Sequence, residues 1–477
     1  MIRITSFVFL YIVSFIVSFY ISPPDLTEKN NLLALKHPFV SEENTLIASD
    51  SMNNLINAET YFTLQQLKQD FSQLRNIYEN QHIKLYEYTS KDIFDSLFDH
   101  QLSLINRPMQ YHEYFQILAP INDNIGCMHS SIWLPGMFWE SGKEKLFPLQ
   151  IKLIEGFAVV SGYYSDTVQV PLGSIVLEIN SYPVEKIISD LKNSYSSDGF
   201  IEQFQYAQVE KRFPMAFARY YGFQERYIIT YALPGRKTKE RKELIPANLT
   251  EVRKIVFKNF DHPPPSLRIL NDINTAMLRI PSFIFYDRVD YFKAFLDSAF
   301  LEIKNKHIEN LILDLRGNDG GDPFCAVPLF SYLEKQLVPY FAEEYGRYSE
   351  FAKPIPLAEN RFSGNLFTLI DKHCGSTNGH FCALLKYHKI GKIIGEEGGS
   401  TYKCNARTKE FILDNTKIMV YVPQGTFSAA VKDMDKTRGV EPDYYVTQIY
   451  KDYLNGKDTI LEFVKKLILE KENKNEE

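Results

Sequence analysis

A serine stands where a strand gives way to a helix, in the stretch LFTLIDKHCGSTNGHFCALLK (366–386). The pattern predicts a strand that ends near Asp371 and a helix that begins near Ser376. A helix N-terminus carries free N–H groups and partial positive charge, which favour an anion. This position suits a nucleophile whose attack creates an oxyanion. The alternative is that Ser376 only caps the helix.

A glycine-rich turn follows an apolar strand in LILDLRGNDGGD (311–322). Ligands of such α/β sheets bind at the carboxyl ends of the strands. Gly320 and Gly321 would let backbone N–H groups approach a ligand closely. The alternative is a structural turn built on Asp314 and Arg316. A phosphate loop is disfavoured because no G-K-[ST] follows.

These two junctions are joined by further motifs in a recognisable order. IIGEEGG (393–399) follows the serine helix, and RGVEPDYYV (438–446) closes the segment. The order resembles the tail-specific (C-terminal-processing) and tricorn serine peptidase family over about 270–447. The resemblance implies that Ser376 is the nucleophile. It also implies that N–H groups of Gly320 or Gly321 and of Thr377 form the oxyanion hole, without a metal or cofactor.

A serine nucleophile needs a base, and the family uses two kinds. Tail-processing members use a lysine downstream of the serine, but Thr401 stands at that position, with Lys403 two residues later. The tricorn-like branch uses a histidine in a G-D-x-H-[ST] segment. INDNIGCMHSSIWLP (121–135) resembles this segment, with His129 at the histidine and Cys127 where Asp is usual. We therefore predict His129 as the general base.

The carboxylate that would orient this base is left open by the sequence. Tricorn-like members carry a Glu shortly before G-V-x-P-D, where this chain has Lys436. Asp435 is our candidate for the orienting acid, with Asp433 and Glu441 nearby as alternatives. Without any carboxylate, a Ser–His pair would still be active but slower.

Other residues near Ser376 have competing interpretations. His380 lies one helical turn after the serine and would either touch substrate or be structural. His373 lies at the strand end and is not expected to reach back. Cys374 as the nucleophile is disfavoured by the family register D-x-x-x-x-S. The five cysteines contain no C-x-x-C pair and are expected to be mostly small buried hydrophobic residues.

Composition and patterning bound the architecture. The chain has 477 residues, a length that predicts several folded units. Its net charge of −6 argues against a nucleic-acid partner. Arg3 and the apolar run 4–21 predict a signal peptide or membrane anchor over 1–22, and therefore an exported protein in the periplasm or outside the cell.

We expect an α/β protein whose regions follow in chain order. LGSIVLEINSYPVEKIISDL (172–191) resembles the end of the family's PDZ-like module, with Ser181 in place of a usual glycine. The expected units are a helical region carrying His129 (23–140), a PDZ-like and β module (141–260), a catalytic core of crotonase-like ββα type (261–450), and a C-terminal helix with a charged tail (451–477).

The leading hypothesis is a serine peptidase that acts on peptides or proteins. A second hypothesis is a binding protein for peptides or lipids that keeps the fold and has lost the chemistry, motivated by the departures at Ser181, Thr401 and Lys436. A third is a crotonase-like acyl-transforming enzyme. It would need a coenzyme A site, for which no basic pocket is apparent in the sequence.

Overall fold

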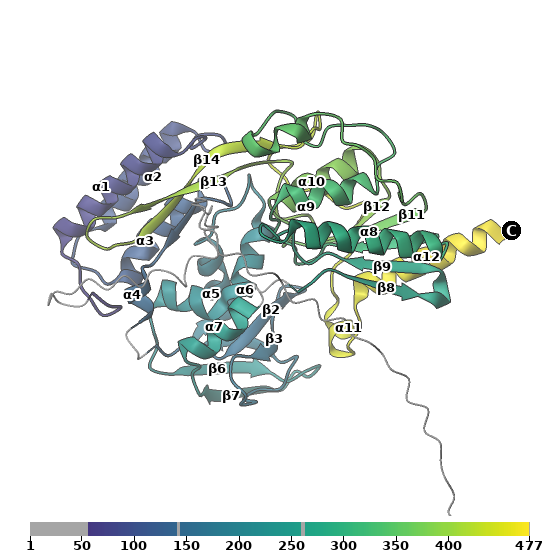
Figure 1. The fold of residues 1–477 in the computed structure, drawn as a ribbon. Coiled ribbons are helices and arrows are strands. Elements are labelled where there is room, and N and C mark those ends of the chain that lie inside the picture. Colours follow the sequence, from purple (N-terminus) through teal and green to yellow (C-terminus); the bar gives the residue numbers. More distant parts are fainter. Residues whose placement is uncertain (1–55, 141–143, 259–262, 477) are drawn as a thin grey trace, which may run out of the picture. The chain divides into compact units, whose positions relative to one another are not determined.

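A computed structural model describes residues 56–140, 144–258 and 263–476, in which helices surround three separate sheets (Figure 1). The expected signal or anchor segment, 1–22, lies outside these residues. Within the described ranges, no helix combines the length and the apolar character that a membrane span requires.

The N-terminal region is helical, as its apolar spacing predicts. Its first helix begins at a capping box between Thr63 and Gln66, and it buries Leu67, Phe71 and Leu74 on one face. The helices are α1 (Leu64–Gln81), α2 (Lys91–Leu104), α3 (Tyr111–Asp123) and the short α4 (Gly136–Trp139).

The first strand joins this region to a hairpin from the other end of the chain. β1 (Ser131–Trp133) pairs antiparallel with β14 (Met419–Ser428), which pairs with β13 (Lys403–Ile412). Nothing in the sequence predicts the pairing of this late hairpin with 131–133. This pairing brings the segment that carries His129 to the C-terminal part of the chain.

The middle of the chain forms a β module with its own hydrophobic core. Its strands pair in the order β2-β3-β4-β6-β7, with β5 beside β4. The basic stretch 234–242 enters the edge strand β7, whose side chains are almost all exposed. Exposed charged side chains on an edge strand oppose its pairing with another chain. The elements are β2 (Leu149–Ile154), β3 (Phe157–Tyr163), β4 (Ile175–Ile179), β5 (Tyr182–Pro183), α5 (Val184–Lys192), α6 (Glu202–Tyr221), β6 (Tyr227–Ala232), β7 (Lys239–Leu244) and α7 (Leu249–Lys258).

The third sheet has the order β15-β12-β11-β10-β9-β8, and only β8 runs antiparallel to its neighbour. The sheet is therefore largely parallel. Its elements are β8 (Ser266–Leu270), β9 (Thr275–Arg279), α8 (Val289–Asn305), β10 (Asn310–Asp314), α9 (Pro323–Ser331), β11 (Asn365–Ile370), α10 (Thr377–Tyr387), β12 (Lys392–Gly395), β15 (Tyr444–Tyr445), α11 (Tyr450–Leu454) and α12 (Thr459–Glu476).

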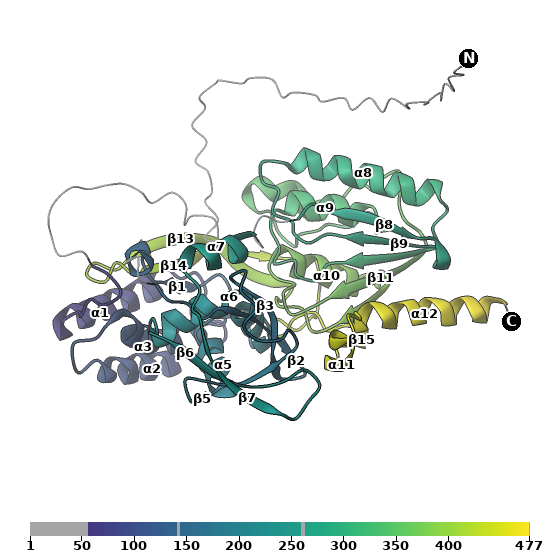
Figure 2. The same cartoon turned by 90° about the horizontal axis from the view of Figure 1, so that it is seen from below.

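Helices cover both faces of this sheet (Figure 2). Side chains of β10 alternate: Leu311 and Leu313 join the core under α8, α9 and α10, whereas Ile312 joins the core under α12. Burial on both faces explains why β10 reads as a continuous apolar run. The glycine-rich turn follows β10 and the Ser376 turn follows β11. Because these strands are parallel neighbours, both turns lie at the carboxyl ends of the strands.

Candidate active site

Ser376 does not have the backbone of an ordinary helix cap. It precedes α10 with φ +50° and ψ −124°, and its side chain makes no capping hydrogen bond. An ordinary N-cap residue is extended and its side chain accepts from the first turn. A non-glycine residue in this left-handed conformation is strained by about 1–3 kcal/mol. The capping alternative therefore does not describe Ser376.

The glycine-rich turn after β10 lies directly against this serine. A Cβ on Gly320 would lie 2.9 Å from Ser376 Cβ and 2.6 Å from the Gly375 carbonyl oxygen, so only glycine fits there. Buried Asn318 joins the two turns, because its carbonyl accepts from Gly375 N at 3.3 Å and from Asn378 Nδ2 at 3.0 Å. The two motifs thus form one rigid unit.

The predicted oxyanion amides differ in how they are engaged. Gly320 N–H donates to Asn318 Oδ1 at 2.8 Å. The Gly320 carbonyl accepts from Phe283 N, so the Gly321 N–H, on the opposite side of the same trans peptide, points away from Phe283. Thr377 is the first residue of α10, and its N–H therefore has no partner within the helix. The Thr377 hydroxyl donates to the Gly321 carbonyl at 2.6 Å, which holds these two amides together.

The turn that carries His129 packs on the nucleophile turn. A Cβ on Gly375 would lie 2.8 Å from Met128 Cε. Cys127 Sγ lies 3.6 Å from the Asn405 carbonyl oxygen, and the neighbouring Cys404 thiol hydrogen bonds with Ser376. The two residues before His129 are therefore placed next to the elements that place the serine.

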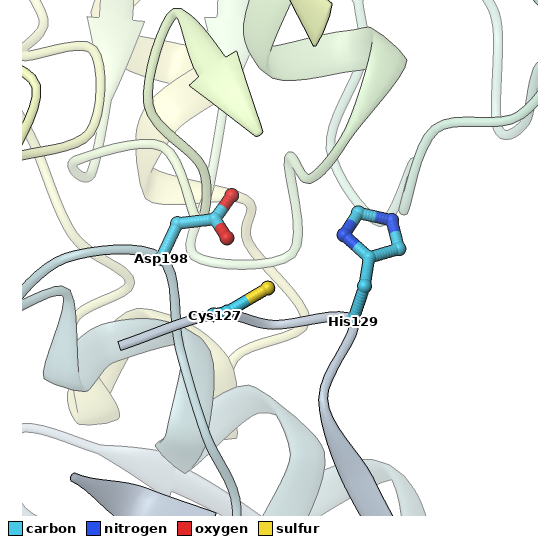
Figure 3. A group of neighbouring side chains, drawn as sticks. All are labelled: Cys127, His129 and Asp198. Atoms are coloured by element: carbon cyan, nitrogen blue, oxygen red, sulfur yellow. The ribbon is translucent and has the colours of Figure 1, made fainter. Parts of the chain in front are cut away.

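Asp198 is the carboxylate of this site, and the sequence did not single it out. Its carboxylate accepts from Met128 N at 3.0 Å and from the Ser400 hydroxyl at 2.6 Å, and it is fully buried. One ligating atom each of Asp198, His129 and Cys127 lies within 4.8 Å of the others, and the three side chains converge (Figure 3). Burial raises the pKa of Asp198 to about 6, although the hydrogen bonds from Ser400 and Met128 lower it.

Asp435, the predicted orienting acid, lies elsewhere. It is exposed, and its carboxylate accepts from the N–H of Thr437 at 2.8 Å and from the hydroxyl of the same residue at 2.7 Å. An aspartate two residues before a threonine readily makes such a local turn. In the described chain, Asp198 rather than Asp435 is grouped with His129.

The lysine of the tail-processing branch is also engaged elsewhere. Lys403 Nζ pairs with Glu87 at 2.6 Å, and the Thr401 hydroxyl donates to the Lys403 carbonyl. Lys436, at the usual glutamate position, lies 4.0 Å from the same Glu87. Both lysines therefore lie beside one carboxylate, that of Glu87.

The other histidines have structural surroundings. His380 is buried, its Nε2 lies 3.4 Å from Cys404 Sγ, and burial lowers its pKa to about 4. His373 lies 3.7 Å from Glu210 and 3.9 Å from Asp319. His380 thus lies against a thiol, and His373 lies between two carboxylates.

Cys374 is not set up as a nucleophile. All five cysteines are buried and free, as expected of small hydrophobic residues. The Cys374 thiol lies 3.3 Å from the Leu315 carbonyl oxygen, and burial raises its pKa well above the usual value. A reactive cysteine needs the opposite shift.

Similarity to known proteins agrees with this geometry. Residues 274–446 match the model of peptidase family S41. This segment of the chain is similar to the peptidase domain of family S41. The tricorn protease homolog of Saccharolobus solfataricus is 29% identical over 197 residues, which are 40% of this chain and 16% of the relative. The tricorn protease of Thermoplasma acidophilum is 27% identical over 183 residues, 37% of this chain and 16% of that protein.

The chain thus matches only about a sixth of the length of these relatives. Solved structures extend the likeness of fold. Mature CPAF is 14% identical with a TM-score of 0.60, over 82% of this chain and 94% of that chain. Mature CPAF complexed with lactacystin is 13% identical with a TM-score of 0.63, over 85% of this chain and 98% of that chain. The predicted resemblance to this family is confirmed.

Proposed function

We propose that this protein is a serine peptidase that hydrolyses peptide bonds through an acyl-enzyme on Ser376. The observation that carries the proposal is the strained backbone of Ser376, whose hydroxyl does not cap its helix. Such strain persists only where the surrounding structure enforces it, and the Gly320 turn does so. The S41 domain supplies the reaction class.

In this mechanism His129 accepts the proton of Ser376 as its oxygen attacks the peptide carbonyl. N–H groups of Gly321 and Thr377 stabilise the oxyanion, and His129 then protonates the leaving amine. Water hydrolyses the acyl-enzyme with the same base. Asp198 orients His129 and stabilises its imidazolium, which is a role for a buried carboxylate beside an imidazole.

Labelling with a fluorophosphonate probe and hydrolysis of unstructured protein substrates test this proposal. Ser376→Ala should abolish both signals. His129→Ala and Asp198→Asn should slow labelling by about 100-fold or more. Asp435→Asn is the matched carboxylate change, and we expect it to cost much less than Asp198→Asn. A Ser376→Ala protein that still hydrolyses substrate would contradict the proposal, whereas a folded wild type that never labels would favour a binding protein on this fold.

The finer features of the fold and location belong to the same proposal. We assign the sheet of β8–β12 and β15 with α8–α10 as a crotonase-like ββα core, and the β2–β7 module as PDZ-like. We further propose export, on the charged and apolar pattern of 1–22. Fractionation of cells expressing the full chain tests the location, since retention in the cytoplasm would refute export.

A further inference from the structure

The residues around the proposed base include a thiol that peptide hydrolysis does not use. Cys127, His129 and Asp198 each offer one ligating atom, and these three atoms lie within 4.8 Å of one another (Figure 3). They come from two segments distant in sequence. Two hydrogen bonds join the loop that carries Asp198 to the other segment. Cys127 N donates to Ser196 Oγ at 3.0 Å, and Gly199 N donates to the Gly126 carbonyl at 3.0 Å. The cluster is therefore a defined part of the fold.

The carboxylate of this cluster lies in a place that favours a cation. Asp198 is 2% exposed, and Met128 N and the Ser400 hydroxyl, both neutral, each donate to one of its oxygens. Within the described ranges neither a lysine nor an arginine pairs with it, and nearby Glu87 disfavours its charged form further. A buried carboxylate in such surroundings is costly, and a bound cation would offset that cost.

The Cys127 thiol lies among groups that act on its charge in opposite directions. Backbone N–H groups of His129 and Ser130 and the Ser130 hydroxyl all favour the charged form of Cys127. His82 Nδ1 accepts from Lys84 N at 3.1 Å, so its Nε2 carries the proton and donates to Ser130 Oγ at 2.9 Å. The Ser130 proton is then available to the sulfur. Burial and the nearby Asp198 carboxylate outweigh these hydrogen bonds and raise the pKa of Cys127 to about 12, but a metal ion displaces a thiol proton when it binds.

The donor set selects the kind of metal. Sulfur, imidazole nitrogen and carboxylate oxygen together suit zinc, whereas magnesium and calcium prefer oxygen alone. Zinc bonds of about 2.0–2.3 Å place tetrahedral ligand atoms about 3.3–3.8 Å apart. Starting from separations within 4.8 Å, side-chain shifts on the order of 1 Å would close the site. Three protein ligands leave a fourth position open to water.

We propose that Cys127, His129 and Asp198 bind one zinc ion and that this binding switches off the peptidase. The inhibitory part rests on the function proposed above. A neutral imidazole has one lone pair, which takes either a proton or a metal. Zinc on His129 therefore occupies the pair that would accept the Ser376 proton, and the Cys127 proton leaves to solvent.

Direct binding tests the site independently of activity. The full chain with Ser376→Ala is titrated with zinc against a chromogenic chelator, alone and combined with Cys127→Ser or with the control Cys325→Ser. Cys325 is likewise buried but lies in α9. We expect one zinc per chain, a dissociation constant at least about tenfold higher with Cys127→Ser, and no change with Cys325→Ser. Cobalt in place of zinc should give a thiolate charge-transfer absorption that only Cys127→Ser removes.

Fluorophosphonate labelling of the chain with its native Ser376 then tests the inhibition. Zinc should suppress labelling, and a chelator should restore it. The Cys127→Ser variant should need a higher zinc concentration than the chain with Cys127 before its labelling rate falls to half of its metal-free value. Absence of stoichiometric binding, or equal affinity in the two cysteine variants, would overturn the site. Binding that depends on Cys127 in a chain that never labels would keep the site and refute both the inhibition and the peptidase, so the two failures are distinguishable.

Discussion

Replacing Gly320 by alanine tests whether the glycine turn positions the nucleophile. A Cβ at this residue would lie 2.6 Å from the Gly375 carbonyl oxygen, 2.9 Å from Ser376 Cβ and 2.9 Å from Thr377 N. These three atoms are backbone atoms or a Cβ of the serine turn, so none of them is the end of a flexible side chain that could move aside. Gly320 also has φ +104°, which strains any residue with a Cβ.

The expected cost has two parts. The unfavourable φ contributes about 1–3 kcal/mol and the overpacking about 1–3 kcal/mol, so the free energy of unfolding should fall by about 2–6 kcal/mol. If the serine turn shifts by about 1 Å to relieve the contact, the rate should fall about 100-fold. That loss corresponds to a barrier about 2.7 kcal/mol higher.

Gly317→Ala is the matched control, because Gly317 belongs to the same turn and also has positive φ, +78°. A Cβ there would meet nothing within 4 Å. The two variants therefore share backbone strain and differ in contact with Ser376. Fluorophosphonate labelling rates and denaturant titrations of both variants would measure the difference. Equal labelling rates in the two variants would refute the argument that Gly320 positions the serine.

Three further changes test separate contacts. Ser376→Gly should be more stable than Ser376→Ala by about 1 kcal/mol, because relief of strain exceeds the entropy cost of glycine, and equal denaturation midpoints would contradict this. The double change Lys403→Met with Glu87→Gln removes an ion pair without leaving one charge buried, and it should preserve labelling, whereas a loss as deep as that of Ser376→Ala would indicate a Ser–Lys pair. Glu210→Gln should lower the free energy of unfolding at pH 7 by about 2–4 kcal/mol, because Lys372 and a neighbouring histidine overcome burial and hold the pKa of Glu210 at about 2. This lowered pKa stabilises the fold above pH 4.5, so the difference from wild type should shrink as pH falls from about 4.5 toward 2, and a constant difference in titrations at pH 7 and pH 3 would refute it.

The sequence predicted those parts of the molecule whose cause is local. The helices α1 to α3, the parallel strands β9 to β12 and the helix after Ser376 all follow from periodicity and from turn residues. The register between β10 and β11 then places the glycine turn and the serine at one edge without further information. For this reason the closeness of the glycine turn to the proposed nucleophile was accessible to sequence reasoning.

The carboxylate of the site was not accessible, because nothing local marks it. Asp198 lies in a loop between α5 and α6, and its hydrogen-bond partners Met128 and Ser400 are 70 and 202 residues away in sequence. Asp435, by contrast, stands close to a family motif, which made it the natural candidate. Its local turn with Thr437 removes it from the site. Only the pairing of distant segments distinguishes the two aspartates.

The departure at Cys127 connects the proposed catalysis with the proposed control. An aspartate at this position would give the cluster two oxygens and one nitrogen, a harder donor set with less preference for zinc. The thiol instead adds the soft ligand, while Asp198 from another loop supplies the carboxylate that His129 needs. Because both roles converge on His129, a change of the carboxylate should affect catalysis and metal binding together, whereas a change of the thiol should separate them.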